Sequence, residues 1–163
     1  MSKPLSAFAG EALYLDTTAL YALLRGIEPG VQALFTRIEH AELRAYTSVL
    51  TFDELAYRML LALIRDRYGS SPLDHLRDQE PQMIAEFYPR LAPYLQQLQT
   101  FPNLILIEVA PADLDLMDDA MLTYNLRPRD ALHLAAMQKC GCLDLGSHDP
   151  DFDRVPTVCR YTL

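Results

Sequence analysis

The sequence contains no apolar run that approaches the ~18 residues required by a membrane-spanning helix. The amino-terminal segment MSKPLSAFAGEALYLD also lacks the long apolar core of a signal peptide. Cysteine is scarce, and the odd number and spacing of its three residues fit neither a disulfide framework nor the C-x-x-C pattern of zinc and redox sites. We therefore expect a cytoplasmic protein with free thiols and no membrane association.

Positively charged residues are also fewer than negatively charged ones. The chain has 14 Lys and Arg residues and 22 Asp and Glu residues, which gives a net charge of -8. This balance argues against nucleic-acid binding through a basic surface alone. It does not exclude an enzyme whose acidic residues hold divalent cations, because the cations then supply the positive charge.

Short apolar segments alternate with amphipathic segments along the 163 residues, half of which are hydrophobic. The alternation predicts an α/β fold with three layers, α/β/α, around a central, mostly parallel sheet of four or five strands. The length fits one domain that spans residues 1–163. We predict strands at residues 12–15, 45–50, 103–109 and 142–147, a fifth within 155–163, and helices at 19–25, 30–44, 51–69, 82–99, 112–125 and 128–140.

Residues 70–100 are the least regular part of the sequence, and we expect a helical insertion or extension there. The polar stretch SSPLDHLRDQEP at residues 70–81 is interrupted by prolines, which predicts a loop or a short insertion. Residues 82–99 have helical periodicity, but Pro89 and Pro93 predict a break or a kink.

Four acidic residues stand at predicted element ends. Asp16 and Asp149 follow strands, whereas Glu54 and Asp130 lie in the first turns of helices. Ligands of open α/β sheets gather outside the carboxyl ends of the strands, so the fold would bring these carboxylates to one edge. Crowded carboxylates raise each other's pKa unless a cation neutralises them. Oxygen ligands suit Mg²⁺ or Mn²⁺, and two such ions can activate water for phosphodiester cleavage.

Each of these acids also has a purely structural explanation. Asp16 can cap the helix that follows it, and Asp130 can be a charge favoured by a helix N-terminus. Glu54 can be the return arm of a capping box that begins at Thr51, or it can pair with Arg58 one turn later.

The stretch SHDPDFDRV places aspartates at three alternate positions, Asp149, Asp151 and Asp153. They match positions 1, 3 and 5 of an EF-hand loop, but Arg154 and Arg160 stand where that loop requires Gly and Glu. A strand is also predicted before the triplet, where the EF-hand has a helix. The calcium loop is therefore rejected, and a solvated turn remains the alternative to a carboxylate cluster.

Four stretches together resemble the PIN domain family of nucleases, which includes the VapC-like toxins of toxin–antitoxin pairs. Their order and spacing cover nearly the whole chain, and the third followed by the fourth is the most specific combination. The resemblance implies a PIN-like fold. The stretches are YLDTTAL at 14–20, TSVLTFDELAYR at 47–58, RPRDALHLAAM at 127–137 and GSHDPDFDRV at 146–155.

The resemblance also implies the site residues. Asp16, Glu54, Asp130 and Asp149 would be the catalytic acids that bind Mg²⁺ or Mn²⁺, and Asp151 would be an auxiliary metal ligand. Small hydroxyl side chains would orient water or phosphate, and arginines are candidates to guide the RNA backbone. These substrate-binding candidates are Thr17, Thr18, Ser147, Arg58, Arg127, Arg129 and Arg154.

The activity implied is that of an endoribonuclease that cleaves RNA phosphodiester bonds through activated water, as the toxin of a type II toxin–antitoxin system. The same resemblance implies a homodimer and inhibition by a small antitoxin. The alternative is a catalytically inactive PIN-like domain that binds protein or RNA. A site for hard cations prefers oxygen ligands, so His148 is expected to be a loop residue and not a metal ligand. His133 is expected to pack or hydrogen-bond inside the domain.

Overall fold

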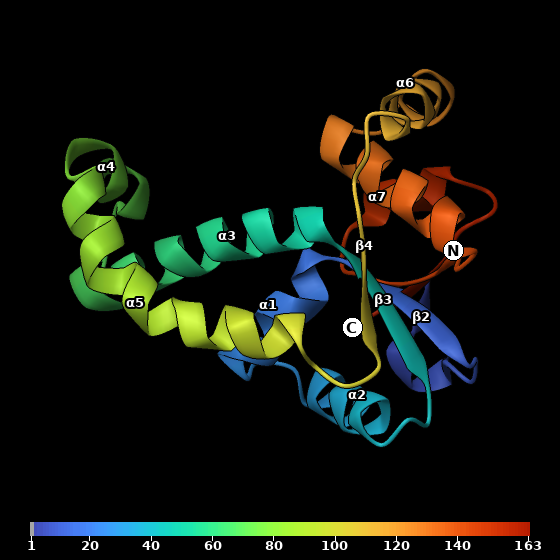
Figure 1. Cartoon of the computed structure of the whole chain (residues 1–163), viewed down its shortest axis with the longest axis horizontal. Coiled ribbons are helices and arrows are strands. Elements are labelled where there is room, and N and C mark those ends of the chain that lie inside the picture. The colour runs from blue at the N-terminus through green and yellow to red at the C-terminus, as the bar shows by residue number, and fades with distance from the viewer. Residues whose placement is uncertain (1) are drawn as a thin grey trace.

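The computed structural model describes residues 2–163, and its centre is a sheet of six parallel strands (Figure 1). The predicted α/β class with a parallel sheet is confirmed, with one strand more than expected. The additional strand, β1, has only two residues and is too short to show a periodic pattern. The sheet order is β1-β6-β5-β2-β3-β4, with β1 at Lys3–Pro4, β2 at Ala12–Leu15, β3 at Arg44–Ser48, β4 at Leu104–Ile107, β5 at Asp144–Gly146 and β6 at Cys159–Thr162.

Helices cover both faces of this sheet. Helices α1, α2, α3 and α5 pack on one face, α7 packs on the other, and α6 packs on α7 (Figure 1). Within residues 2–163, none of the helices combines the length and apolar character needed to cross a bilayer. The helices are α1 at Thr17–Arg25, α2 at Pro29–Glu39, α3 at Val49–Tyr68, α4 at Pro72–Asp78, α5 at Glu80–Gln99, α6 at Asp113–Tyr124 and α7 at Pro128–Cys140, with 3-10 turns at Leu5–Ala7 and Pro150–Arg154.

The central strand β2 joins the two helical layers. Leu13 and Leu15 are buried in the cluster that includes α1 and α2, whereas Tyr14 packs with Ala136 and Met137 of α7. Successive side chains of a strand point to opposite faces, so the uninterrupted apolar run of β2 is buried on both sides. The three-layer arrangement follows from this double burial.

The order of the strands reverses at β2. From β2 the chain first moves to β3 and β4 on one side of the sheet, and later to β5 and β6 on the other. The carboxyl ends of β2 and β5 are therefore neighbours at the position where open α/β sheets bind ligands. Asp16 directly follows β2, and Ser147 directly follows β5.

The segment at residues 70–100 is more regular than predicted. Helix α4 occupies much of the expected loop, because Pro72 is at the start of the helix, where proline is tolerated. Of the break or kink expected at Pro89 and Pro93, the break does not occur, because α5 is continuous through both prolines. Both prolines are exposed, whereas the opposite side of α5 is buried, so packing outweighs the local cost of proline.

The α3–α5 pair extends away from the sheet, with α4 at its far end (Figure 1). This end has an apolar cluster of its own, which explains how helices can project beyond the main core. The cluster consists of Leu60, Ile64, Leu76, Met83 and Phe87.

The two interior prolines of α5 make a stability prediction. Each lacks an amide hydrogen and its ring crowds the carbonyl of the preceding turn. Replacement of the exposed Pro93 by Ala is expected to raise the free energy of unfolding by about 1–3 kcal/mol in urea titrations.

Pro81→Ala is the matched control, because Pro81 lies in the first turn of the same helix, where proline is tolerated. An equal gain in both variants would show that the position of proline within α5 does not matter.

Candidate functional site

Asp16 is the first acid at the carboxyl edge of the sheet, and it is only 5% exposed. It caps α1, because one carboxylate oxygen accepts hydrogen bonds from the Thr18 amide at 2.8 Å and the Thr18 hydroxyl at 2.6 Å. Burial raises the pKa of Asp16, although hydrogen bonds from Ser147 and Thr18 act in the opposite direction. Asp16 is thus a helix cap, and its second oxygen points toward the end of β5.

Ser147 connects Asp16 to Asp149. Its fully buried hydroxyl donates a hydrogen bond to the second oxygen of Asp16 and accepts one from the Asp149 amide at 2.9 Å. Thr18 makes a parallel connection, because its hydroxyl accepts a hydrogen bond from the His148 amide at 3.1 Å. These contacts fix the segment after β5 against the start of α1.

Asp130, Asp149 and Asp151 converge most closely, with one carboxylate oxygen of each lying within 4.8 Å of the others. Burial and the charges of Asp149 and Asp151 raise the pKa of Asp130 to about 6. The buried Oδ2 of Asp130 has no hydrogen-bond partner anywhere in residues 2–163. A half-buried carboxylate that lies near two other acids and lacks a hydrogen-bond donor would be stabilised by a nearby positive charge.

Glu54 lies on α3 and does not belong to this group of three. Its Oε1 is 3.2 Å from Nε2 of His133, and its side chain is 19% exposed. Burial acts to raise its pKa, but the hydrogen bond with His133 and the charges of His133 and Arg129 outweigh burial, so the pKa is lowered. The pKa of Glu54 is thus shifted in the opposite direction to the pKa values of Asp16 and Asp130.

The structural alternatives for Glu54 do not hold. Helix α3 begins at Val49 with Ser48 as its cap, so Thr51 is inside the helix and no capping box forms. The hydroxyl of Thr51 is buried and lies 2.9 Å from that of Thr47. Arg58 makes no ion pair with Glu54 within the described residues, and lies over the Tyr21 ring at 4.5 Å.

The three aspartates of the triplet have different surroundings. Asp149 caps the 3-10 turn and accepts a hydrogen bond from the Asp151 amide at 2.9 Å. Asp151 belongs to the acid cluster but is also paired with Arg154 at 2.7 Å. Asp153 turns away and forms two 2.9 Å hydrogen bonds with the buried Arg160, which lower its pKa. The triplet is thus a structured turn that directs two carboxylates into the site and uses the third as an anchor.

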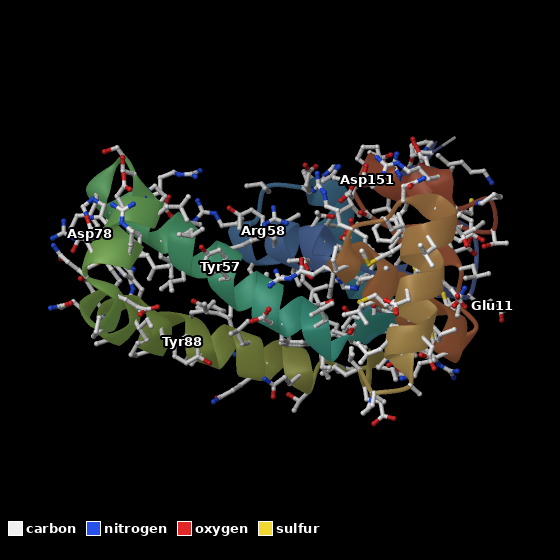
Figure 2. All side chains as sticks on the ribbon, turned by 90° about the horizontal axis from the view of Figure 1, so that it is seen from above. Glu11, Tyr57, Arg58, Asp78, Tyr88 and Asp151 are labelled. Atoms are coloured by element: carbon white, nitrogen blue, oxygen red, sulfur yellow. The ribbon has the colours of Figure 1, made fainter. Side chains whose placement is uncertain are left out.

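Of the four arginines predicted to bind RNA, Arg127 and Arg154 contact Asp151 of the acid cluster, whereas the other two contact residues outside the cluster. Arg127 is 3.9 Å from Asp151, and Arg154 also donates to the carbonyl of Asn125. Arg129 pairs with Asp53 at 3.1 Å. Figure 2 shows Arg58 on α3, between Asp78 near the tip of the α3–α5 pair and Asp151 at the other end of the molecule.

Thr17, a candidate from sequence for orienting water or phosphate, is buried, and its hydroxyl has no hydrogen-bond partner within residues 2–163. The partners of His133 were not assigned from sequence. His133 was expected to hydrogen-bond internally, but nothing in its surroundings in the sequence identified Glu54 and Tyr14 as its partners. His148 is a loop residue, as expected, 3.6 Å from Glu28.

A sequence model of the PIN domain matches residues 13–158. This chain belongs to the PIN domain family. No curated protein matches the sequence of this PIN domain.

Solved structures of the same fold come from several bacteria. A toxin–antitoxin complex from Klebsiella pneumoniae is 20% identical, with a TM-score of 0.53 over 90% of this chain and 94% of that one. VapBC2 from Rickettsia felis, bound to a DNA fragment from its promoter, is 12% identical, with a TM-score of 0.61 over 93% and 98%. VapC20 of Mycobacterium tuberculosis, a sarcin-ricin loop cleaving toxin, is 15% identical, with a TM-score of 0.57 over 88% and 95%. At these identities the similarity concerns the fold.

The donor set of this PIN domain fits a hard divalent cation. The converging groups are carboxylate oxygens, which Mg²⁺ and Mn²⁺ prefer, and no cysteine belongs to the cluster. The unpartnered Oδ2 of Asp130 and the raised pKa of this residue both indicate a position that a cation would stabilise.

The raised pKa of Asp130 predicts a pH-dependent penalty in the metal-free protein. Below the ordinary value of 3.8 the carboxyl is protonated in both the folded and unfolded states and costs nothing. As the pH rises to about 6 the unfolded state ionises first, so stability is lost over this window. Asp130→Asn is expected to stabilise the metal-free protein by about 1–2 kcal/mol near neutral pH after allowance for solvent screening, and not at about pH 4.

Urea unfolding at both pH values measures this difference, and added Mg²⁺ should stabilise the unsubstituted protein but not the variant. Asp118→Asn, at an exposed position on α6, controls for the loss of one negative charge. A variant that is less stable than the unsubstituted protein near neutral pH without metal would contradict the assignment.

Proposed function

We propose that this PIN domain is a metal-dependent endoribonuclease that hydrolyses RNA phosphodiester bonds with Mg²⁺ or Mn²⁺. We also propose that it acts as the toxin of a type II toxin–antitoxin pair. The observation that carries the proposal is the convergence of Asp130, Asp149 and Asp151, together with the buried Oδ2 of Asp130, which has no donor among residues 2–163. Membership of the PIN domain family supports it, because this is a family of nucleases.

Asp16, Glu54, Asp130 and Asp149 are the proposed catalytic acids, with Asp151 as an auxiliary ligand. When bound, divalent cations would supply Lewis-acid chemistry, by lowering the pKa of water and neutralising the phosphate. Hydrogen bonds within the protein hold these acids in place: Ser147 contacts Asp16 and the Asp149 amide, and His133 contacts Glu54. Asp151 is already partly neutralised by Arg154, which supports an auxiliary rather than a central role.

Hydroxyl groups at the site divide into two roles. Ser147 and Thr18 already make hydrogen bonds that orient Asp16 and the segment of Asp149, so we propose that they position these acids. The hydroxyl of Thr17 is buried and unpartnered within residues 2–163, so it is the proposed group for orienting water or a phosphate oxygen.

Arginines at the rim are proposed to bind the RNA backbone, because guanidinium groups match phosphate oxygens. Arg127 is the strongest candidate, because its side chain is 78% exposed and makes only a 3.9 Å contact with Asp151. Binding of the RNA backbone needs positive charge at the site itself, because the chain as a whole has a net charge of -8. The proposed set comprises Arg58, Arg127, Arg129 and Arg154.

The choice of RNA and of an antitoxin partner is supported by the solved structures of similar fold. The Mycobacterium tuberculosis protein is a toxin that cleaves the sarcin-ricin loop. The Klebsiella pneumoniae structure is a toxin–antitoxin complex. By this similarity we propose that the chain acts on RNA, forms a homodimer and is inhibited by a small antitoxin.

Purified protein is expected to cleave RNA in Mg²⁺ or Mn²⁺, to stop in EDTA and to recover when excess metal is added. Asp16→Asn and Asp149→Asn are each expected to lower kcat by about 10- to 100-fold, because each removes a charge that holds the cation. Gel assays on ribosomal, transfer and messenger RNA measure this, with Asp118→Asn as the active control.

Cleavage that survives both substitutions would assign the activity to another site or a contaminant. Absence of cleavage on every RNA, with metal bound, would favour the inactive protein- or RNA-binding domain.

A further inference from the structure

A chain of hydrogen bonds leads from the protein interior to Glu54, and the catalytic roles given above use only this last member. The hydroxyl of Tyr14 is 2.9 Å from Nδ1 of His133, and Nε2 of His133 is 3.2 Å from Oε1 of Glu54. Tyr14 is completely buried and His133 is 2% exposed. Both ring nitrogens of this histidine are therefore occupied by protein groups, without any contribution from solvent.

In the neutral form of His133, the chemistry of the three groups fixes the direction of the hydrogen bonds. An ionised carboxylate only accepts, so the proton that bridges to Glu54 is on Nε2 of His133. A neutral imidazole with its proton on Nε2 has a lone pair at Nδ1. The Tyr14 hydroxyl must then donate to Nδ1, since a tyrosine retains its proton at neutral pH.

The same chain of hydrogen bonds connects β2, α3 and α7, which position Asp16, Glu54 and Asp130. Tyr14 is on β2, two residues before Asp16, and Glu54 is on α3. His133 is on α7, one turn after Asp130, so the two side chains lie on the same face of this helix. One is an acid of the site, and the other supports the acid Glu54. A glutamate has more rotatable bonds than an aspartate, and a ligand of this length needs support to keep one geometry.

We propose that Tyr14 and His133 are positioning residues: the Tyr14 hydroxyl selects the Nε2–H tautomer of His133, and this N–H holds one oxygen of the Glu54 carboxylate. In this proposal the other oxygen of Glu54 faces the cation. The role in metal binding rests on the proposed metal-dependent function. The tautomer of His133, in contrast, is a property of the metal-free protein and can be measured without that function. Neither residue touches the substrate.

Two substitutions of His133 separate positioning from packing. In His133→Gln the side-chain amide nitrogen reaches the place of Nε2 and retains the donor to Glu54. In His133→Asn the amide reaches only the place of Nδ1, so the donor to Glu54 is lost. Both variants replace an aromatic ring by an amide, so a purely structural role would not favour one over the other in cation affinity.

Tyr14→Phe tests the other end of the chain, because it removes only the hydroxyl. Without this donor, Nδ1 of His133 is unsatisfied, and the tautomer with its proton on Nδ1 becomes competitive. Tyr124→Phe is the matched control, since Tyr124 is a partly buried tyrosine on α6 outside this chain of hydrogen bonds.

The first measurement is ¹⁵N NMR of the histidine rings in metal-free protein, with His133 assigned by its loss in His133→Gln. We expect a single Nε2–H tautomer in the unsubstituted protein and in Tyr124→Phe, and a mixed population in Tyr14→Phe. A proton on Nδ1 in the unsubstituted protein, or a tautomer unaffected by Tyr14→Phe, would overturn the proposal without any functional assay.

The second measurement is Mn²⁺ affinity by calorimetry. We expect His133→Asn to lose about 10-fold or more, as supporting partners of metal ligands typically do, and His133→Gln to stay within about 3-fold. Equal affinities in the two variants would overturn the proposal. If the tautomer and affinity results hold while no RNA is cleaved, the positioning role stands and the nuclease proposal fails.

Discussion

Mutual repulsion among half-buried carboxylates is the constraint on which the rest of this structure depends. Asp130, Asp149 and Asp151 bring oxygens within 4.8 Å of one another, and burial together with the charges of Asp149 and Asp151 raises the pKa of Asp130 to about 6. Such an arrangement is unfavourable in isolation, and a chain with a net charge of -8 offers little general compensation. The fold tolerates it because each carboxylate is fixed by rigid elements and because a cation would convert the repulsion into binding energy.

Two hydrogen-bond networks provide that rigidity from opposite sides. One runs from Asp16 through Ser147 to Asp149 and joins the ends of β2 and β5. The other runs from Tyr14 through His133 to Glu54 and joins β2, α7 and α3. One begins directly after β2 and the other on β2, so the central strand determines the placement of acids that are far apart in sequence.

Much of this architecture could be predicted from sequence, because apolar strands and acidic residues at strand ends have local signatures. The helical periodicity of α5 was also visible in the sequence, but its continuity through Pro89 and Pro93 was not, since the buried side of the helix stabilises it and burial is a tertiary property. The role of Asp153, which turns away from the site, depends on its pairing with Arg160 of β6. The partners of His133 were likewise unpredictable, because Tyr14 and Glu54 are 119 and 79 residues away from it.

Diffraction from crystals grown with Mn²⁺ tests the central claim most directly, because anomalous scattering locates the ion without reference to activity. The account predicts a peak between Asp130 and Asp149, about 2.0–2.3 Å from a carboxylate oxygen of each, the spacing of hard cations of this size. Glu54 and Asp16 should face the same ion or a second one beside it. A saturated crystal with no anomalous peak at these acids, or with Mn²⁺ only elsewhere on the surface, would contradict it.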